Sequence, residues 1–173
     1  MSVSMYEVSV PVFRASLADM RAWLDKPEVR KDEAALLEAR LAPDMRPLPA
    51  QFQMASDTAK NAIARLCGIE APSMADTEAS FDELKQRCDR TIAFIEGVDR
   101  SALDASEQRE VVLRFPNGMG YRFTGIGYLT SYALPNFFFH VTTAYAIMRA
   151  GGAPVGKPDF LQHLGPPSLV GDA

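Results

Sequence analysis

The sequence has few of the residues that build metal centres, disulfides or nucleic-acid surfaces. It holds two histidines and two cysteines among 173 residues, and it has 18 Lys and Arg compared with 22 Asp and Glu. Cys67 and Cys88 lack C-x-x-C spacing and cannot form a disulfide framework, so we expect small core residues rather than nucleophiles. The net charge of -4, without a basic block, removes the electrostatic basis for binding nucleic acid.

Long hydrophobic runs and common catalytic motifs are also missing. No window approaches about eighteen uninterrupted apolar residues, so we expect no membrane span. The first twenty residues have neither a basic start nor an unbroken apolar stretch, so they do not resemble a signal peptide, and the cytoplasm is the expected location. The Ser-His-Asp order, a phosphate-binding glycine loop and the G-x-S-x-G motif are not found.

What is present is the composition and patterning of a folded helical protein. Hydrophobic residues make up 47% and charged residues 23%, and the length allows one domain, expected over residues 1–173. Four segments carry apolar residues at helical spacing, and a shorter helix is expected at Glu33–Leu41. The four long helices are expected from Tyr6 to before Pro27, from Leu48 to Leu66, from Thr77–Ser80 to Gly97, and from Pro135 to Gly151.

Two other segments depart from that spacing. EVVLRF and YRFTG flank the turn-forming PNGMG, which predicts a β-hairpin over about residues 110–124 that pairs 110–115 with 119–124 and packs on the helices. GIGYLTSYAL then fits either a short helix or the first half of a kinked one. The tail 151–173 is rich in glycine and proline, so we expect an ordered wrap or a loose tail rather than another element.

His140 is the leading candidate for a functional side chain. On a helix it shares one face with Phe137 and Ala144, and Asn136 precedes it by one turn. One interpretation is a polar site in the bundle, with His140 as metal ligand or general base. The other is a buried histidine that hydrogen-bonds a neighbour; it is favoured because a metal needs three or more donors. The other histidine, His163, has no helical partner.

A second candidate is the polar stripe that Gln53, Asp57 and Lys60 form on the helix expected from residue 48. The stripe lies about 100° or more around the helix from the centre of the apolar face, which favours a position on the solvated surface. The alternative is that the stripe faces a second cavity in the bundle. Three phenylalanines at 137–139 point about 100° apart and would cover most of the helix circumference. That helix is then either central or closes a homodimer.

Three stretches of the sequence resemble the bacterial domain-of-unknown-function family numbered nineteen ninety-three (DUF1993), an uncharacterised family, over nearly the whole chain and in the same order. They are LAPDMRPLPAQFQMASDTAKNAIARLCG, PNGMGYRFTG and LPNFFFHVTTAYAIMRAGGAPVGKPDFL. The resemblance implies a mainly all-α, DinB/YfiT-like four-helix bundle, arranged up-down-down-up and carrying one added β-hairpin.

Many members of that superfamily bind a divalent metal through three histidines, and some are thiol-cofactor-using transferases or isomerases. The resemblance places two of the three ligands at Asn136 and His140, and the third within Gln51–Gln53, where we choose Gln53. Amide oxygens are weak donors for zinc or nickel. We therefore expect no resident metal or other cofactor. The alternative is a divalent cation in a mixed pocket to which Asp57 adds a carboxylate.

Two functional classes remain open, and the sequence does not decide between enzyme and non-enzyme. In the first, the protein binds a small molecule in a polar pocket that holds His140, Asn136, Gln53 and Asp57. In the second, it is a non-catalytic bundle, dimeric and structural or interaction-based, that has lost the superfamily metal site. The expected partners are thus a small molecule or a second copy of the chain.

Overall fold

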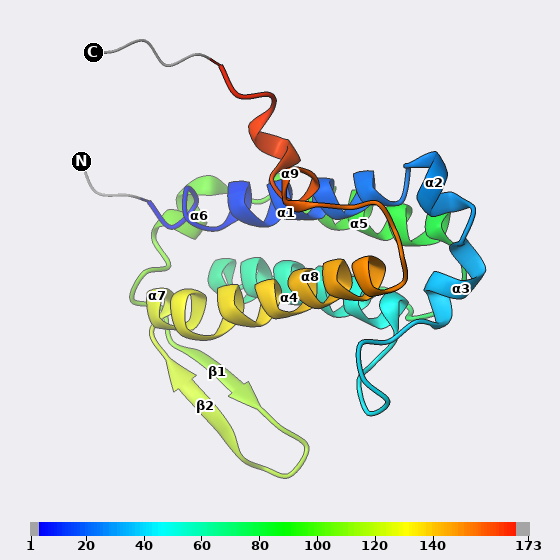
Figure 1. Cartoon of the computed structure of the whole chain (residues 1–173). Helices are drawn as coiled ribbons and strands as arrows, with labels where there is room; N and C mark the ends of the chain where they lie inside the picture. Colours follow the sequence, from blue (N-terminus) through cyan, green and yellow to red (C-terminus); the bar gives the residue numbers. More distant parts are fainter. Residues whose placement is uncertain (1–3, 169–173) are drawn as a thin grey trace.

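Four long helices lie side by side in the computed structural model, which describes residues 4–168 (Figure 1). They are α1 (Val10–Trp23), α4 (Leu48–Cys67), α5 (Phe81–Glu96) and α8 (Leu134–Ala150). The shorter elements are α2 (Pro27–Arg30), α3 (Glu33–Glu38), α6 (Arg100–Asp104), α7 (Gly125–Tyr128), α9 (Lys157–Phe160), β1 (Val111–Arg114) and β2 (Gly120–Phe123). Within the described residues, no helix has the length and hydropathy needed to cross a membrane.

The long helices run up, down, down and up along the bundle. Helices α1 and α5 are antiparallel, because Arg14 pairs with Glu96 near one end and Asp25 pairs with Lys85 near the other. Helices α4 and α8 are antiparallel as well, while α4 and α5 run parallel and are joined by residues 69–80 along the bundle (Figure 1). The predicted four-helix bundle with one added hairpin is confirmed.

The helix ends follow local backbone chemistry. Pro11 and Pro49 lie in the first turns of α1 and α4, where a missing N–H costs no hydrogen bond. Gly68 ends α4 with φ at 71°, a left-handed conformation that glycine adopts without strain. At the start of α5, the Ser80 hydroxyl accepts a hydrogen bond from the backbone N–H of Glu83 at 3.2 Å and so caps the helix.

Helix α8 continues the segment before it without a break. Residues Leu129–Ala133 form a π-helix that connects α7 to α8. Of the two alternatives for this segment, the structure therefore has the first half of a longer helix, interrupted by a π-helical turn, and not a separate short helix. Pro135 has no N–H and its ring crowds the preceding turn, and the wider π-helical turn accommodates both. Gly125 starts the helix close to other backbone: a β-carbon there would lie 2.0 Å from the carbonyl oxygen of Ser106.

The hairpin is confirmed with slightly shorter strands than expected. Val111 pairs with Phe123, and the register continues to Arg114 opposite Gly120. Val111 is buried, and the Phe123 ring lies 6.0 Å from that of Tyr128, so one face of the hairpin packs on the start of the α7–α8 helix. The hairpin then projects away from the bundle (Figure 1).

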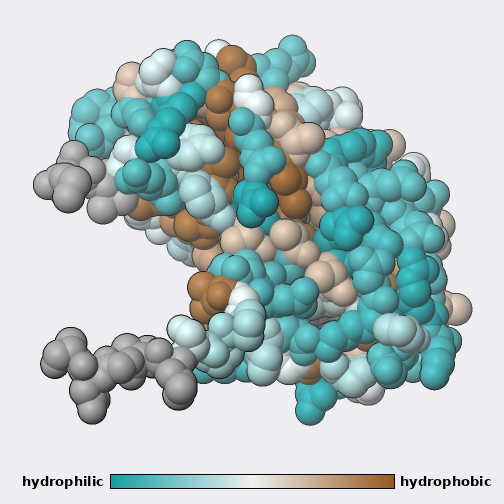
Figure 2. Space-filling model, turned by 90° about the horizontal axis from the view of Figure 1, so that it is seen from above, coloured by the Kyte–Doolittle hydropathy of each residue, from teal (hydrophilic) through white to brown (hydrophobic). Residues whose placement is uncertain are grey.

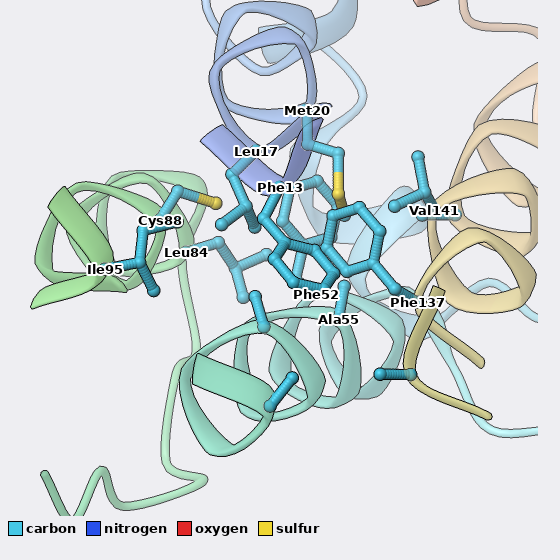
Figure 3. Packing of buried hydrophobic residues seen from close by; sticks show 14 of the residues in the cluster. Phe13, Leu17, Met20, Phe52, Ala55, Leu84, Cys88, Ile95, Phe137 and Val141 are labelled. Carbon is cyan, nitrogen blue, oxygen red and sulfur yellow. The ribbon is translucent and has the colours of Figure 1, made fainter. Parts of the chain in front are cut away.

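The core forms where all four long helices meet (Figure 3). Phe13 of α1 and Phe137 of α8 contact edge to face, with ring centroids 4.8 Å apart. Cys88 is fully buried, and burial raises the pKa of its thiol to about 12, which makes it a core residue, as expected, rather than a nucleophile. The residues labelled in Figure 3 are Phe13, Leu17, Met20, Phe52, Ala55, Leu84, Cys88, Ile95, Phe137 and Val141.

The expectation that three phenylalanines enclose the fourth helix is wrong for one of them. Phe137 is buried and Phe138 is half-buried, but Phe139 is 56% exposed. Helix α8 therefore has a solvent-facing side, whereas α4 packs closely against both α8 and α5 and also contacts α1. The homodimer stays a prediction.

The C-terminal segment contains structure that the glycine- and proline-rich composition did not predict. Helix α9 and a 3-10 turn at Gln162–Leu164 lie against α1. Trp23 donates its indole N–H to the carbonyl oxygen of Asp159 at 3.0 Å and stacks on Phe160. The predicted tail is thus an ordered wrap with a short helix as far as residue 168, and 169–173 lie outside the described residues.

The core assignment predicts a large loss of stability for one of two nearby phenylalanines and almost none for the other. Phe137→Ala should lower the free energy of unfolding by about 3–5 kcal/mol, because it leaves a cavity beside Phe13. Phe139→Ala on the same helix is the matched control and should change it by no more than about 0.5 kcal/mol. Urea denaturation followed by circular dichroism measures both; equal effects would contradict the assignment.

Candidate functional site

A polar groove of about 270 Å³ lies between α4 and the continuous α7–α8 helix. Residues four positions apart lie nearly above one another on a helix, and both walls use this spacing. The α7–α8 wall consists of Tyr128, Tyr132, Asn136 and His140. The α4 wall consists of Met54, Asp57, Thr58, Asn61 and Arg65. We call this site the α4–α8 groove.

His140 is held in one orientation by Gln51. The His140 Nδ1 atom lies 3.0 Å from the Oε1 atom of Gln51, whose Nε2 donates to the carbonyl oxygen of Arg46 at 3.0 Å. The second bond fixes which end of the amide faces the ring, so Oε1 is the acceptor and His140 Nδ1 carries the proton. In the neutral ring, Nε2 is then an unprotonated acceptor on the side of the groove that His140 lines.

Burial keeps His140 neutral. The residue is 8% exposed, and loss of hydration lowers the pKa of His140 because the charged imidazolium is the form that water stabilises. A neutral imidazole with a free nitrogen can accept a hydrogen bond or take up a proton. The site therefore holds a base rather than a cation at this position.

Asn136 adds a second acceptor one turn away. Its Nδ2 donates to the hydroxyl of Thr58 at 2.8 Å, and that hydroxyl donates to the carbonyl oxygen of Met54 at 2.7 Å. These two bonds fix the amide, which leaves Oδ1 as an acceptor beside His140. Two acceptors on one helix face favour a ligand group that carries several N–H or O–H donors.

Asp57 lines the groove and is also part of a buried ionic network. Its Oδ1 accepts a hydrogen bond from Arg87 Nη2 at 2.8 Å and lies 3.1 Å from Lys60 Nζ. Arg87 is fully buried and also donates to Glu78 at 2.8 Å. Burial alone would raise the pKa of Glu78, but the hydrogen bonds from Arg87 and Gln53 hold it below its usual value.

The expected solvated face is therefore wrong. Lys60 is only 6% exposed, and Gln53 and Asp57 are half-buried. The physical reason is the position of α4, which packs against α8 on one side and α5 on the other. The flank of its apolar stripe faces α5 and the connection 69–80 instead of water.

The choice of Gln53 as the partner of His140 on this helix is also wrong by two positions. Gln51 faces His140, and two residues amount to about 200° around a helix. Gln53 points to the other flank, where its Nε2 donates to Glu78 Oε2 at 3.0 Å. Of the four predicted site residues, the structure brings His140, Asn136 and Asp57 to one groove and places Gln53 elsewhere.

The far end of the groove was missed by sequence reasoning. Arg65 donates through Nη1 to the hydroxyl oxygen of Tyr128 at 3.0 Å, and burial raises the pKa of Tyr128. The signal was available: Asp57, Asn61 and Arg65 follow one another at intervals of four, as do the residues of the opposite wall. The sequence alone leaves open whether the segment that carries Tyr128 continues into the long helix, so it does not show that the two four-residue series face each other.

The residues present do not fit the three-imidazole metal site that the resemblance implies. Gln51 Oε1 accepts from His140, and Asn136 offers only an amide oxygen. Asp57 is engaged by Arg87 and Lys60. Among residues 4–168, no cluster of three or more His, Cys, Asp or Glu side chains could hold a metal ion.

The burial of His140 predicts a pH dependence. The unfolded chain takes up a proton near pH 6.5, whereas folded His140 stays neutral to lower pH. Its contribution to stability is therefore present above pH 6.5 and lost as the pH falls through the folded pKa. An NMR titration of the imidazole signals, assigned with a His163→Asn variant, should place the His140 midpoint below 6.5. A midpoint at or above 6.5 would contradict the buried, neutral state.

Comparisons with known proteins agree with this fold. The family model "Domain of unknown function (DUF1993)" matches residues 5–161. The structure is similar to the crystal structure of a DinB family member protein from Shewanella denitrificans, with a TM-score of 0.81 and 34% sequence identity over 97% of this chain and 94% of that one. No curated protein matches the chain. The chain therefore belongs to the uncharacterised DUF1993 family and has a DinB-like four-helix fold.

Proposed function

We propose that the protein binds an elongated, polar small molecule in the α4–α8 groove. The observation that carries the proposal is the Gln51–His140 hydrogen bond, because it sets the proton on Nδ1 and leaves Nε2 for a ligand. Asn136 Oδ1 supplies a second acceptor at the same end. Arg65 supplies a cation at the other end.

The dimensions of the groove define the kind of ligand. Thr58 and Arg65 are seven residues apart on α4, which is about 10 Å along a helix. The volume of about 270 Å³ is near the lower limit for small-molecule pockets. A narrow site of that length suits a flexible chain better than a fused ring system.

The chemistry of the two ends differs in sign. At one end, His140 Nε2 and Asn136 Oδ1 can accept hydrogen bonds, so an ammonium or amine group suits this end. At the other, the Arg65 guanidinium can donate to a carboxylate through the N–H groups that Tyr128 does not use. The ligand class with both features is an ω-amino carboxylate or a short peptide.

The same end of the groove can accept a proton. His140 is a neutral base whose second nitrogen is hydrogen-bonded and oriented, the arrangement found in general-base catalysis. His140 makes one side-chain hydrogen bond within the described residues, through Nδ1, and also lines the groove. This arrangement supports a binding site over a non-catalytic bundle.

Isothermal titration calorimetry with a series from 4-aminobutyrate to 8-aminooctanoate tests the proposal. Affinity should peak at a chain that spans the groove, and hexanoate and hexylamine should each bind about tenfold more weakly than 6-aminohexanoate because they lack one end. Arg65→Gln and His140→Phe should each weaken binding by about tenfold or more. Thr142→Ala, on the exposed side of α8, is the control and should leave binding unchanged.

The variants separate binding from folding. Arg65 is exposed, so Arg65→Gln tests the groove even if His140→Phe lowers stability by leaving Gln51 unpaired. Binding that neither variant weakens would overturn the proposal, as would no binding by any member of the series at millimolar concentration. Either result would favour the non-catalytic bundle.

A further inference from the structure

The second histidine of the chain is also held by a single partner, on a different face of the bundle. Asp19 of α1 is 3% exposed and directs both carboxylate oxygens at His163. Its Oδ1 accepts the backbone N–H of His163 at 3.0 Å, and its Oδ2 lies 2.5 Å from the ring Nδ1. The two bonds fix both the backbone and the ring of His163.

This arrangement assigns the ring protons. An ionised carboxylate only accepts, so His163 Nδ1 carries a proton, and Nε2 is left as the acceptor of the neutral ring. Nε2 of the neutral ring can therefore accept a hydrogen bond from a third group.

A cavity of about 350 Å³ lies beside His163, between α1, α8 and the C-terminal segment. Its walls are apolar: Pro11 and Val12 of α1, Phe138 of α8 and Phe160 of α9 line it. The view from above shows a hollow with brown and tan hydrophobic surface on this side of the molecule (Figure 2). Ser16 and His163 are the polar residues that line it.

We propose that this cavity binds a small aromatic alcohol of the alkylphenol class, whose hydroxyl donates to His163 Nε2. The ring and alkyl group displace water from the apolar walls, which is the main source of affinity for such a ligand. Phe138 and Phe160 supply aromatic faces and edges for the ring. The Ser16 hydroxyl lines the same cavity and can donate to the phenol oxygen.

The charge of the site selects a neutral ligand over an anion. The lining residues include no lysine or arginine, and the buried Asp19 carboxylate lies directly behind His163. A carboxylate in the cavity would face that negative charge across the ring. A phenol is neutral, and its hydroxyl can donate a hydrogen bond to His163 Nε2, on the side of the ring away from Asp19.

A role in anchoring alone does not account for the pair. The C-terminal segment is already attached to α1 by the bond from Trp23 to Asp159 and by the stacking of Trp23 on Phe160, and to the start of α2 by the ion pair of Lys26 with Asp159 at 2.5 Å. The Asp19–His163 pair adds something that these contacts lack, which is an oriented acceptor at the edge of an apolar cavity.

NMR titration of the ¹⁵N-labelled full chain tests the proposal with three matched compounds. 4-Ethylphenol should give saturable shifts of the amide signals of residues 12–16, 138 and 160–163. 4-Ethyltoluene, which replaces the hydroxyl with a methyl group, and 4-ethylbenzoate should each bind about tenfold or more weakly. Shifts outside the cavity, at the α4–α8 groove, would place the ligand elsewhere and overturn the assignment.

Variants identify the residues responsible. His163→Phe should weaken 4-ethylphenol binding by about tenfold or more, and Gln162→Ala, an exposed neighbour, should not change it. Asp19→Asn is nearly isosteric and tests the positioning role: its amide can donate to Nδ1, which moves the ring proton to Nε2 and removes the acceptor. We expect that variant to bind 4-ethylphenol more weakly and 4-ethylbenzoate more tightly.

The outcomes that would overturn the proposal are specific. They are unchanged 4-ethylphenol binding by the His163→Phe variant, equal or tighter binding of 4-ethylbenzoate by the unmodified protein, and no saturable shift with 4-ethylphenol up to its solubility limit. A thermal unfolding scan of each variant confirms that the comparison is made between folded proteins. None of these results depends on the α4–α8 groove.

Discussion

Helix α4 packs against α1, α5 and α8, and this enclosure decides how its polar residues behave. A buried polar group must find a partner inside the protein, since leaving it unpaired costs about 1–3 kcal/mol. Gln51 meets His140, and Asp57 meets the fully buried Arg87. These pairs stabilise the buried polar groups, and they also fix the positions of His140 and Asp57, which line the groove.

Both histidines of the chain follow one rule. His140 donates a hydrogen bond from its Nδ1–H to an amide oxygen, and His163 donates one from its Nδ1–H to a carboxylate oxygen. Each histidine also lines a cavity, one with mainly polar walls and one with mainly apolar walls. This difference in surroundings is why the two sites are proposed to bind different ligands.

Much of the fold could be predicted from the sequence because the apolar stripes, the Ser80 cap, Gly68 and the hairpin turn are local signals. The site could be predicted only in part. The four-residue spacing that builds the groove is visible in the sequence, but the choice between Gln51 and Gln53 depends on how α4 is rotated against α8. The Asp19–His163 pair joins residues 144 positions apart, and nothing local indicates it.

The central claim is that Gln51 sets the proton of His140 on Nδ1 and leaves Nε2 unprotonated at the groove. A two-bond ¹H–¹⁵N correlation spectrum of the imidazole rings, recorded at pH 7.5, measures this directly. The account predicts a protonated Nδ1 and an unprotonated Nε2 for His140. A spectrum with the proton on Nε2, or one that averages the two tautomers, would contradict it.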